Sequence, residues 1–142
     1  MLEALRRHVR NCASANGGQV VDLRADECFL AFAHPVDALQ AAIELRGRLA
    51  ATRWPAAEAV LLRIGLHTGR PELTASGYIG IDVHRAARVM AAGNGGQIVT
   101  SEAFAAAMEG ALPASTRLLQ LGAVQLRGFS ETESLFLVST PA

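Results

Sequence analysis

The sequence contains no lysine. Its thirteen basic residues are all arginine and are balanced by thirteen acidic residues, so the formal net charge is zero. A chain without excess positive charge lacks the electrostatic footprint of proteins that bind nucleic acid or anionic membranes. We therefore expect neither nucleic acid nor a membrane among its partners.

Long apolar runs and cysteines are also scarce. No apolar run reaches the roughly 20 residues of a membrane-spanning helix, and the first residues lack the apolar segment of a signal peptide. The two cysteines, Cys12 and Cys28, do not have the spacing of a metal site. These features predict a cytoplasmic protein with two reduced thiols. The length of 142 residues predicts a single domain, 1–142, large enough to bury a core.

Hydrophobic periodicity predicts helices that alternate with strands. Helices are expected over 1–13, 35–52, 80–92 and 102–109, and strands over 19–23, 28–33, 60–67, 97–100, 117–127 and 134–139. Pro35 suits the first turn of a helix, and Ser101 is a candidate N-cap. Glycines predict a loop over 69–77 and turns at Gly122 and at Gly128-Phe129. This order predicts an α+β fold, with helices packed on a mostly antiparallel sheet.

The stretch from Arg63 to Ser101 is the most distinctive part of the chain. The strand over 60–67 alternates apolar and polar residues and ends at His67. The helix over 80–92 is expected to bury a stripe that includes Ile79 and Met90. His84 and Arg88 lie four residues apart, so they project from the same side of that helix.

Four motifs of the sequence read RADECFLAF, RIGLHTG, YIGIDVHRAARV and GGQIVTSEA, and a further characteristic stretch runs from 121 to 136. They resemble the catalytic domain of class III nucleotidyl cyclases, which make cyclic AMP or cyclic GMP from a nucleoside triphosphate. They occur in the family's order and cover nearly the whole chain. The resemblance implies a ferredoxin-like βαββαβ core with extra C-terminal strands. It also implies that the first core strand, normally central between 28–33 and 60–67, is absent.

The resemblance also implies a reaction and its site. The ribose 3′-oxygen attacks the α-phosphorus, and two Mg²⁺ or Mn²⁺ ions held by two aspartates activate it and neutralise the triphosphate. An arginine stabilises the transition state, and an asparagine one helical turn earlier orients the ribose. A lysine and an aspartate read the adenine edge. Each site forms between two subunits, one giving the metal ligands and the other the arginine and asparagine.

Two residues of this chain match the family's site. Asp26 is at the position of the second metal aspartate, although an aspartate beside a hairpin turn is often only an exposed carboxylate. Arg88 is at the position of the transition-state arginine, and the alternative is a surface arginine on a helix. His84 replaces the asparagine, and its imidazole lacks the amide's paired donor and acceptor.

The other positions depart from the family's pattern. Asp22 stands at the base-reading lysine, and Gly77 stands at the base-reading aspartate. The first metal aspartate belongs to the absent strand, and Glu27 points to the opposite face from Asp26. We interpret His67 as a structural histidine at a strand end rather than as a general base.

These departures leave several functions open. The first is a cyclase-like domain of nucleotide signalling that is weak or inactive alone and serves as a dimerisation or regulatory module. The second is a half-site partner that supplies Arg88 to a heterodimeric cyclase. The third is a ferredoxin-like ligand-binding or protein-binding domain. An active homodimeric cyclase ranks below the first two. The expected partners are a second copy or another cyclase-type chain, with a nucleoside triphosphate and Mg²⁺ or Mn²⁺ if the site is active.

The absent strand leads to an expectation about assembly. Each buried backbone group without a partner costs about 1–3 kcal/mol, so a gap along a whole strand is too costly for a domain. Either the strands over 28–33 and 60–67 pair directly, or a strand from another chain fills the gap. We expect a homodimer that covers this edge.

Overall fold

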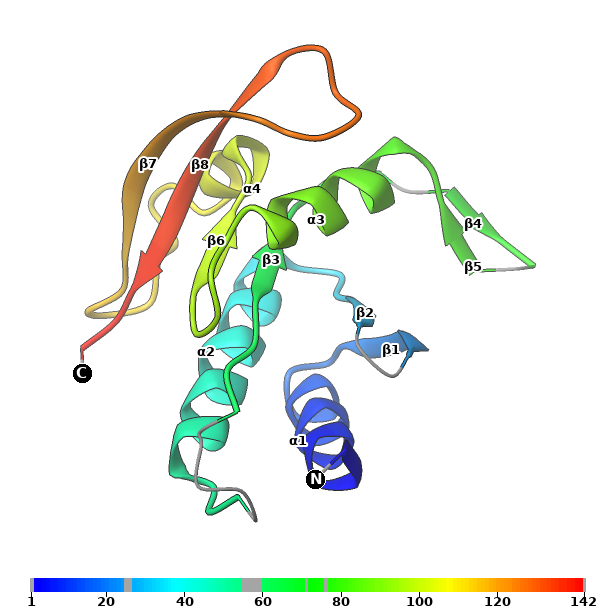
Figure 1. Cartoon of the computed structure of the whole chain (residues 1–142), viewed down its shortest axis with the longest axis vertical. Helices are drawn as coiled ribbons and strands as arrows, with labels where there is room; N and C mark the ends of the chain where they lie inside the picture. Colours follow the sequence, from blue (N-terminus) through cyan, green and yellow to red (C-terminus); the bar gives the residue numbers. More distant parts are fainter. Residues whose placement is uncertain (1, 25–26, 55–59, 71, 76, 142) are drawn as a thin grey trace. The chain divides into compact units, whose positions relative to one another are not determined.

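The computed structural model describes residues 2–24, 27–54, 60–70, 72–75 and 77–141. The chain divides into two compact units, Met1–Leu62 and Arg63–Ala142, and each is described by itself. Figure 1 labels the helices and strands of both units.

The first unit contains two helices and one β-hairpin. Its elements are α1 (Leu2–Ala15), β1 (Gln19–Leu23), β2 (Cys28–Ala31) and α2 (Pro35–Ala51). The two strands pair antiparallel, and α1 packs against α2. The core of the unit consists of apolar side chains from both helices and the segment after α2: Val9, Cys12, Ala13, Leu39, Ala41, Ala42, Leu45, Leu49 and Trp54.

The first unit also contains a polar contact between its helices and two free cysteines. The Asn16 side chain donates hydrogen bonds to the Cys12 carbonyl and to Glu44 of α2, at 2.8 and 3.0 Å. Cys12 and Cys28 are both free thiols. Burial raises the pKa of each thiol, so both remain protonated at neutral pH and are poor nucleophiles.

The second unit is built on a four-stranded sheet. Its elements are β3 (Ile64–Leu66), β4 (Glu72–Thr74), β5 (Gly77–Ile79), α3 (Ile81–Ala91), β6 (Ile98–Thr100), α4 (Glu102–Ala107), β7 (Arg117–Gln125) and β8 (Thr132–Ser139). The strand order is β3-β6-β8-β7, with β3 parallel to β6 and the other pairs antiparallel. β4 and β5 form a separate hairpin before α3 (Figure 1).

The core of the second unit lies between α3 and this sheet. Val89 of α3 packs in a buried cluster with Val99, Leu126 and Leu135. The helix approaches β3 closely at Gly65, where an added Cβ would lie 2.5 Å from the backbone nitrogen of Met90. The absence of a side chain at Gly65 therefore sets the distance between α3 and the sheet.

Four sequence-based predictions about this unit were wrong in detail. The strand expected over 60–67 forms only at Ile64–Leu66, because β6, its neighbour, is itself three residues long. The loop expected over 69–77 contains most of the β4–β5 hairpin. Ile79 belongs to β5 and is 48% exposed, so it is not part of the core of α3. Gly122 does not form a turn: it lies within β7 next to a register shift that leaves Leu121 without a partner, and with a φ of +102° it pairs with Leu135, so the strand continues.

The strand pairs bear on the expected gap. Among the described strands, β2 pairs with β1 and β3 pairs with β6. Direct pairing of β2 with β3, one of the two expected outcomes, is therefore not among them.

Within the described ranges, each helix is too short or too polar to cross a membrane. The cytoplasmic location stays a prediction.

We expect Gly65→Ala to destabilise the second unit by about 1–3 kcal/mol, because the new methyl group meets helix backbone that cannot rotate away. Gly47→Ala in α2 is the matched control: nothing lies within 4 Å of its Cβ position. Alanine there should stabilise the helix by about 0.5–1 kcal/mol. Urea unfolding of both variants measures the shifts, and equal shifts of the same sign would contradict the close approach.

Candidate functional site

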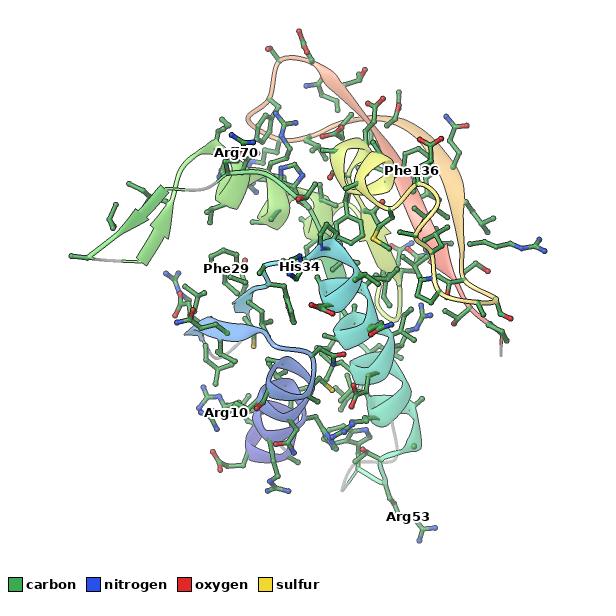
Figure 2. All side chains as sticks on the ribbon, turned by 180° about the vertical axis from the view of Figure 1, so that it is seen from behind. Arg10, Phe29, His34, Arg53, Arg70 and Phe136 are labelled. Carbon is green, nitrogen blue, oxygen red and sulfur yellow. The ribbon has the colours of Figure 1, made fainter. Side chains whose placement is uncertain are left out.

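The segment after β3 is joined to α3 and α4 by a buried histidine. His67 has 5% of its side chain exposed. Its Nδ1 lies 2.7 Å from Ser101 Oγ, and its Nε2 lies 2.8 Å from Asp82 Oδ1. The other carboxylate oxygen, Asp82 Oδ2, accepts a hydrogen bond from the backbone N–H of Arg70 at 3.0 Å. Arg70 is labelled in Figure 2.

One tautomer of this imidazole fits the hydrogen-bonding pattern around it. Ser101 is the N-cap of α4, and its Oγ accepts from the Phe104 N–H at 3.2 Å. The serine hydroxyl is then free to donate to Nδ1, and Nε2–H donates to the Asp82 carboxylate. A neutral imidazole with its proton on Nε2 therefore satisfies all of these contacts.

Serine, histidine and aspartate in a row also occur in hydrolases, but this group cannot act as a nucleophilic triad. Ser101 is fully buried, and its Oγ is already used as a helix cap. A nucleophile must be reachable by the substrate. The structure therefore supports a structural role for His67, as the sequence indicated.

A second set of contacts joins α3 to the turn between β7 and β8. The guanidinium of Arg85 lies over the Phe129 ring, with Cζ 4.3 Å from the ring centroid. The same guanidinium donates from Nη1 to Glu133 Oε1 at 3.0 Å. The His84 ring stacks on Phe129 with a centroid distance of 5.6 Å and an interplanar angle of 28°. Arg85 is therefore neutralised, and the turn is fixed to the helix.

An open pocket lies beside these contacts. It is lined by residues from β3, α3, α4 and β8 and the segments next to them: His67, Thr68, Asp82, Arg85, Glu102, Ala103 and Glu133. Acidic side chains are present, but across the described residues no three His, Cys, Asp or Glu side chains are grouped so that they could hold a metal ion.

Arg88 has a different environment from Arg85. It lies one turn further along α3 and is half-buried. Its Nε is buried without a hydrogen-bond partner, and within the described part of the chain its guanidinium has no ion pair. A buried donor without a partner is unfavourable, and an anion would satisfy it. Arg88 is thus the cation on this helix that is available to an anionic ligand.

Comparison with known proteins identifies the fold. No protein-family model matches the sequence. The chain is 35% identical, over 138 residues, to uncharacterised proteins of Mycobacterium tuberculosis and Mycobacterium bovis. The match covers 94% of this chain and 46% of each relative. The chain therefore spans about half the length of the curated relatives it matches.

Three solved structures cover nearly the whole chain. An adenylate/guanylate cyclase/hydrolase from Silicibacter pomeroyi has a TM-score of 0.84 and 23% identity, over 99% of this chain and 83% of that chain. The guanylate cyclase domain of RhGC from Catenaria anguillulae, in complex with GTP, has a TM-score of 0.79 and 17% identity, over 99% and 82%. A non-canonical dimeric guanylyl cyclase domain of the RhoGC fusion protein from Blastocladiella emersonii has a TM-score of 0.78 and 18% identity, over 98% of this chain and 81% of that chain.

This chain has the adenylate/guanylate cyclase fold. The α+β class and the cyclase-like architecture predicted from the motifs are confirmed. In this cyclase-fold domain, His84 and Arg88 both lie on α3, as the sequence predicted.

The remaining site positions are spread over other elements. Asp26 lies outside the described residues. Asp22 is on β1, where it forms an exposed ion pair with Arg24 at 2.7 Å. Gly77 opens β5 and pairs with Thr74. The structure therefore assigns a side-chain partner to Asp22 and shows none for Arg88 among the residues it describes.

Sequence reasoning missed Asp82, Phe129 and Glu133. Asp82 falls within the helix expected over 80–92, but its distance to His67 depends on how α3 packs. Phe129 was recognised as part of a glycine turn, which predicted the bend but not the helix it contacts. Glu133 gives no signal in the sequence beyond its charge.

The contacts of Asp82 predict a pH dependence of stability. The hydrogen bond from His67 is the largest influence on this carboxyl and lowers its pKa, and the Arg70 amide adds to the effect. A carboxyl whose pKa is lower in the folded state stabilises the protein above its unfolded pKa, about 3.9. That contribution is lost as the pH falls through the lower folded pKa.

We therefore expect Asp82→Asn to lower stability at pH 7, with the difference from the native chain shrinking below about pH 4. Urea unfolding midpoints between pH 7 and pH 3 measure this difference. Glu109→Gln, which removes an exposed carboxylate at the end of α4, is the control and should show a small difference at every pH. If the stability difference between Asp82→Asn and the native chain is the same at every pH, the lowered pKa of Asp82 is contradicted.

Proposed function

We propose that this chain is a cyclase-like domain of nucleotide signalling that is weakly active or inactive alone and works as one half of a dimeric assembly. The observation that carries the proposal is Arg88, a half-buried arginine on α3 with no partner among the described residues. It occupies the position of the transition-state arginine in the cyclase motif. A guanidinium offers several donors to phosphate oxygens, so it suits the charge that develops during cyclisation.

Of the two aspartates that hold the metals in the cyclase family, the sequence matches only one, Asp26. On β1, Asp22 is engaged with Arg24, and a carboxylate cannot replace the lysine that reads adenine, since an ionised carboxylate only accepts hydrogen bonds. These observations support weak or absent activity of the chain alone, and they agree with a role in which a partner supplies the metal ligands.

In such a role, four residues on or next to α3 have defined tasks. Arg88 binds the α-phosphate and stabilises its charge. His84, one turn earlier and exposed, donates one hydrogen bond to the ribose. Asp82 and His67 hold the start of the same helix in place through hydrogen bonds to the segment after β3 and to α4. The partner subunit would supply the carboxylates that bind Mg²⁺ or Mn²⁺, whose chemistry is activation of the attacking hydroxyl.

Complementation tests this division of roles. Purified alone with Mn²⁺ and ATP or GTP, the chain should make little or no cyclic nucleotide. Mixed with a cyclase chain that has both metal aspartates but an alanine at its own transition-state arginine, it should restore synthesis. Arg88→Ala should lower the restored rate about 100-fold or more, because a transition-state donor is lost.

Two further variants make the result specific. Asp26→Ala should leave the restored activity unchanged, since the metals come from the partner. Arg117→Ala, which removes an exposed arginine of β7, controls for loss of charge. Equal losses from Arg88→Ala and Asp26→Ala would contradict the proposed half-site. Ordinary turnover by the chain alone would contradict weak activity, and binding without turnover in any mixture would favour a ligand-binding domain.

We also propose that the chain forms a homodimer or pairs with another cyclase-type chain. Two large apolar side chains around the end of β5, Ile79 and Ile81, are 48% and 63% exposed. Ile79 is the last residue of the β4–β5 hairpin, and Ile81 is the first residue of α3. The resemblance to cyclases implies that the loop over 69–78, which contains most of this hairpin, takes part in the dimer contact. β3 is also an edge strand in the order of the described sheet, and edge strands are the ones to which a further strand can pair.

Sedimentation at micromolar concentration should therefore show a dimer. The double variant Ile79→Asp and Ile81→Asp should shift it to monomer, because a charge in an apolar interface is costly to desolvate. Leu119→Asp, at an exposed apolar position of β7, is the matched control and should leave the dimer intact. A stable monomer of the native chain, or dissociation caused equally by both changes, would contradict the proposed interface.

A further inference from the structure

The turn between β7 and β8 is anchored before it reaches α3. The Phe129 N–H donates to the Leu126 carbonyl at 3.0 Å, which closes a four-residue turn. Leu126 is buried in the cluster with Val89, Val99 and Leu135, and Phe129 packs against that cluster. The Gln125 side chain donates to the Phe129 carbonyl. Backbone and side-chain contacts therefore fix where the Phe129 ring lies.

Gly128 brings this turn close to His84. Its φ of +86° is a conformation that favours glycine at the third position of a turn. A Cβ at this position would lie 3.3 Å from His84 Nε2. The imidazole therefore has the Phe129 ring against one face and the Gly128 backbone near its outer nitrogen.

Phe129 contacts two neighbouring residues of α3 in different ways. Arg85 Cζ lies 4.3 Å from the centroid of the Phe129 ring, in a cation–π contact. The His84 ring stacks on the same ring with a centroid distance of 5.6 Å. Arg85 has a second anchor in Glu133, whose side chain is only 11% exposed. Among the contacts of the described residues, His84 has no second anchor of this kind. An exposed histidine on a helix would otherwise sample several rotamers.

We propose that Phe129 is a positioning residue that holds the His84 imidazole in one orientation before a nucleotide binds. The inference rests on the proposed function, in which His84 contacts the ribose. Phe129 itself does not touch the ligand. It acts through His84, so it affects recognition of the ribose and leaves the Arg88 contact to phosphate unchanged. A held donor loses less conformational entropy on binding than a mobile one.

The first test is independent of any ligand. Stacking on an aromatic ring shifts the signals of the imidazole C–H protons, and NMR of the native chain should show this shift for His84. Phe129→Leu keeps an apolar side chain but removes the ring, so the shift should disappear. Phe129→Tyr keeps the ring and should retain it. Glu133→Gln releases the second anchor of Arg85 and should leave the His84 signals nearly unchanged.

The second test separates ribose from phosphate. Calorimetry is done on the chain mixed with the metal-bearing cyclase chain of the complementation assay. With a non-hydrolysable GTP or ATP analogue, it should show binding about threefold to tenfold weaker for Phe129→Leu than for the native chain, the range expected for one aromatic pair. Inorganic tripolyphosphate, which has no ribose, should bind both equally. Arg88→Ala should weaken both ligands. Phe136→Leu, the same change on β8 (Phe136 is labelled in Figure 2), should affect neither.

The outcomes distinguish the two proposals. Equal weakening of nucleotide and tripolyphosphate by Phe129→Leu would mean a general structural effect, and it would overturn the positioning role. Unchanged His84 signals in Phe129→Leu would overturn it as well. If the mixture of the native chain with that cyclase chain binds neither ligand, the proposed function is wrong, and the NMR result alone then decides whether Phe129 orients His84.

Discussion

The second unit of this domain depends on one buried imidazole. His67 connects the segment after β3 with the N-terminal turn of α3 through Asp82, and with the N-cap of α4 through Ser101. A buried polar network of this kind is stabilising only when each of its members is satisfied, and here a single tautomer satisfies them all. The same contacts determine where α3 begins, and therefore where the two candidate site residues on that helix lie.

Electrostatic pairing then distinguishes two arginines three residues apart on α3. Arg85 is neutralised by Glu133 and covered by Phe129, so it holds the β7–β8 turn. Arg88 has a buried Nε and no partner among the described residues, so it retains its capacity for an anion. A partnered arginine supports the structure, whereas an unpartnered one in a half-buried site favours a ligand. The division follows from which acidic side chain is within reach, not from the arginines themselves.

Local signals predicted much of the fold correctly. Pro35 opens α2, Ser101 caps α4 through the Phe104 N–H, and Gly128 turns the chain between β7 and β8. Each of these depends on neighbouring residues in the sequence, so the sequence contains the information. The predictions at Gly122 and Ile79 were wrong because a bulge or a short hairpin depends on what the neighbouring strand does. The length of β3 was wrong for the same reason, since a strand extends only where it has a partner.

The sequence by itself determined the cyclase fold, the order of its elements and the placement of His84 and Arg88 on one helix. Motif spacing and helical periodicity are properties of short segments, so they can be recognised in the sequence without knowing how the elements pack. Only the tertiary structure decided the partners: Asp82 with His67, Phe129 with His84, and Glu133 with Arg85. These pairs lie 15 to 48 residues apart along the chain, and their distances follow from how α3 packs on the sheet at Gly65.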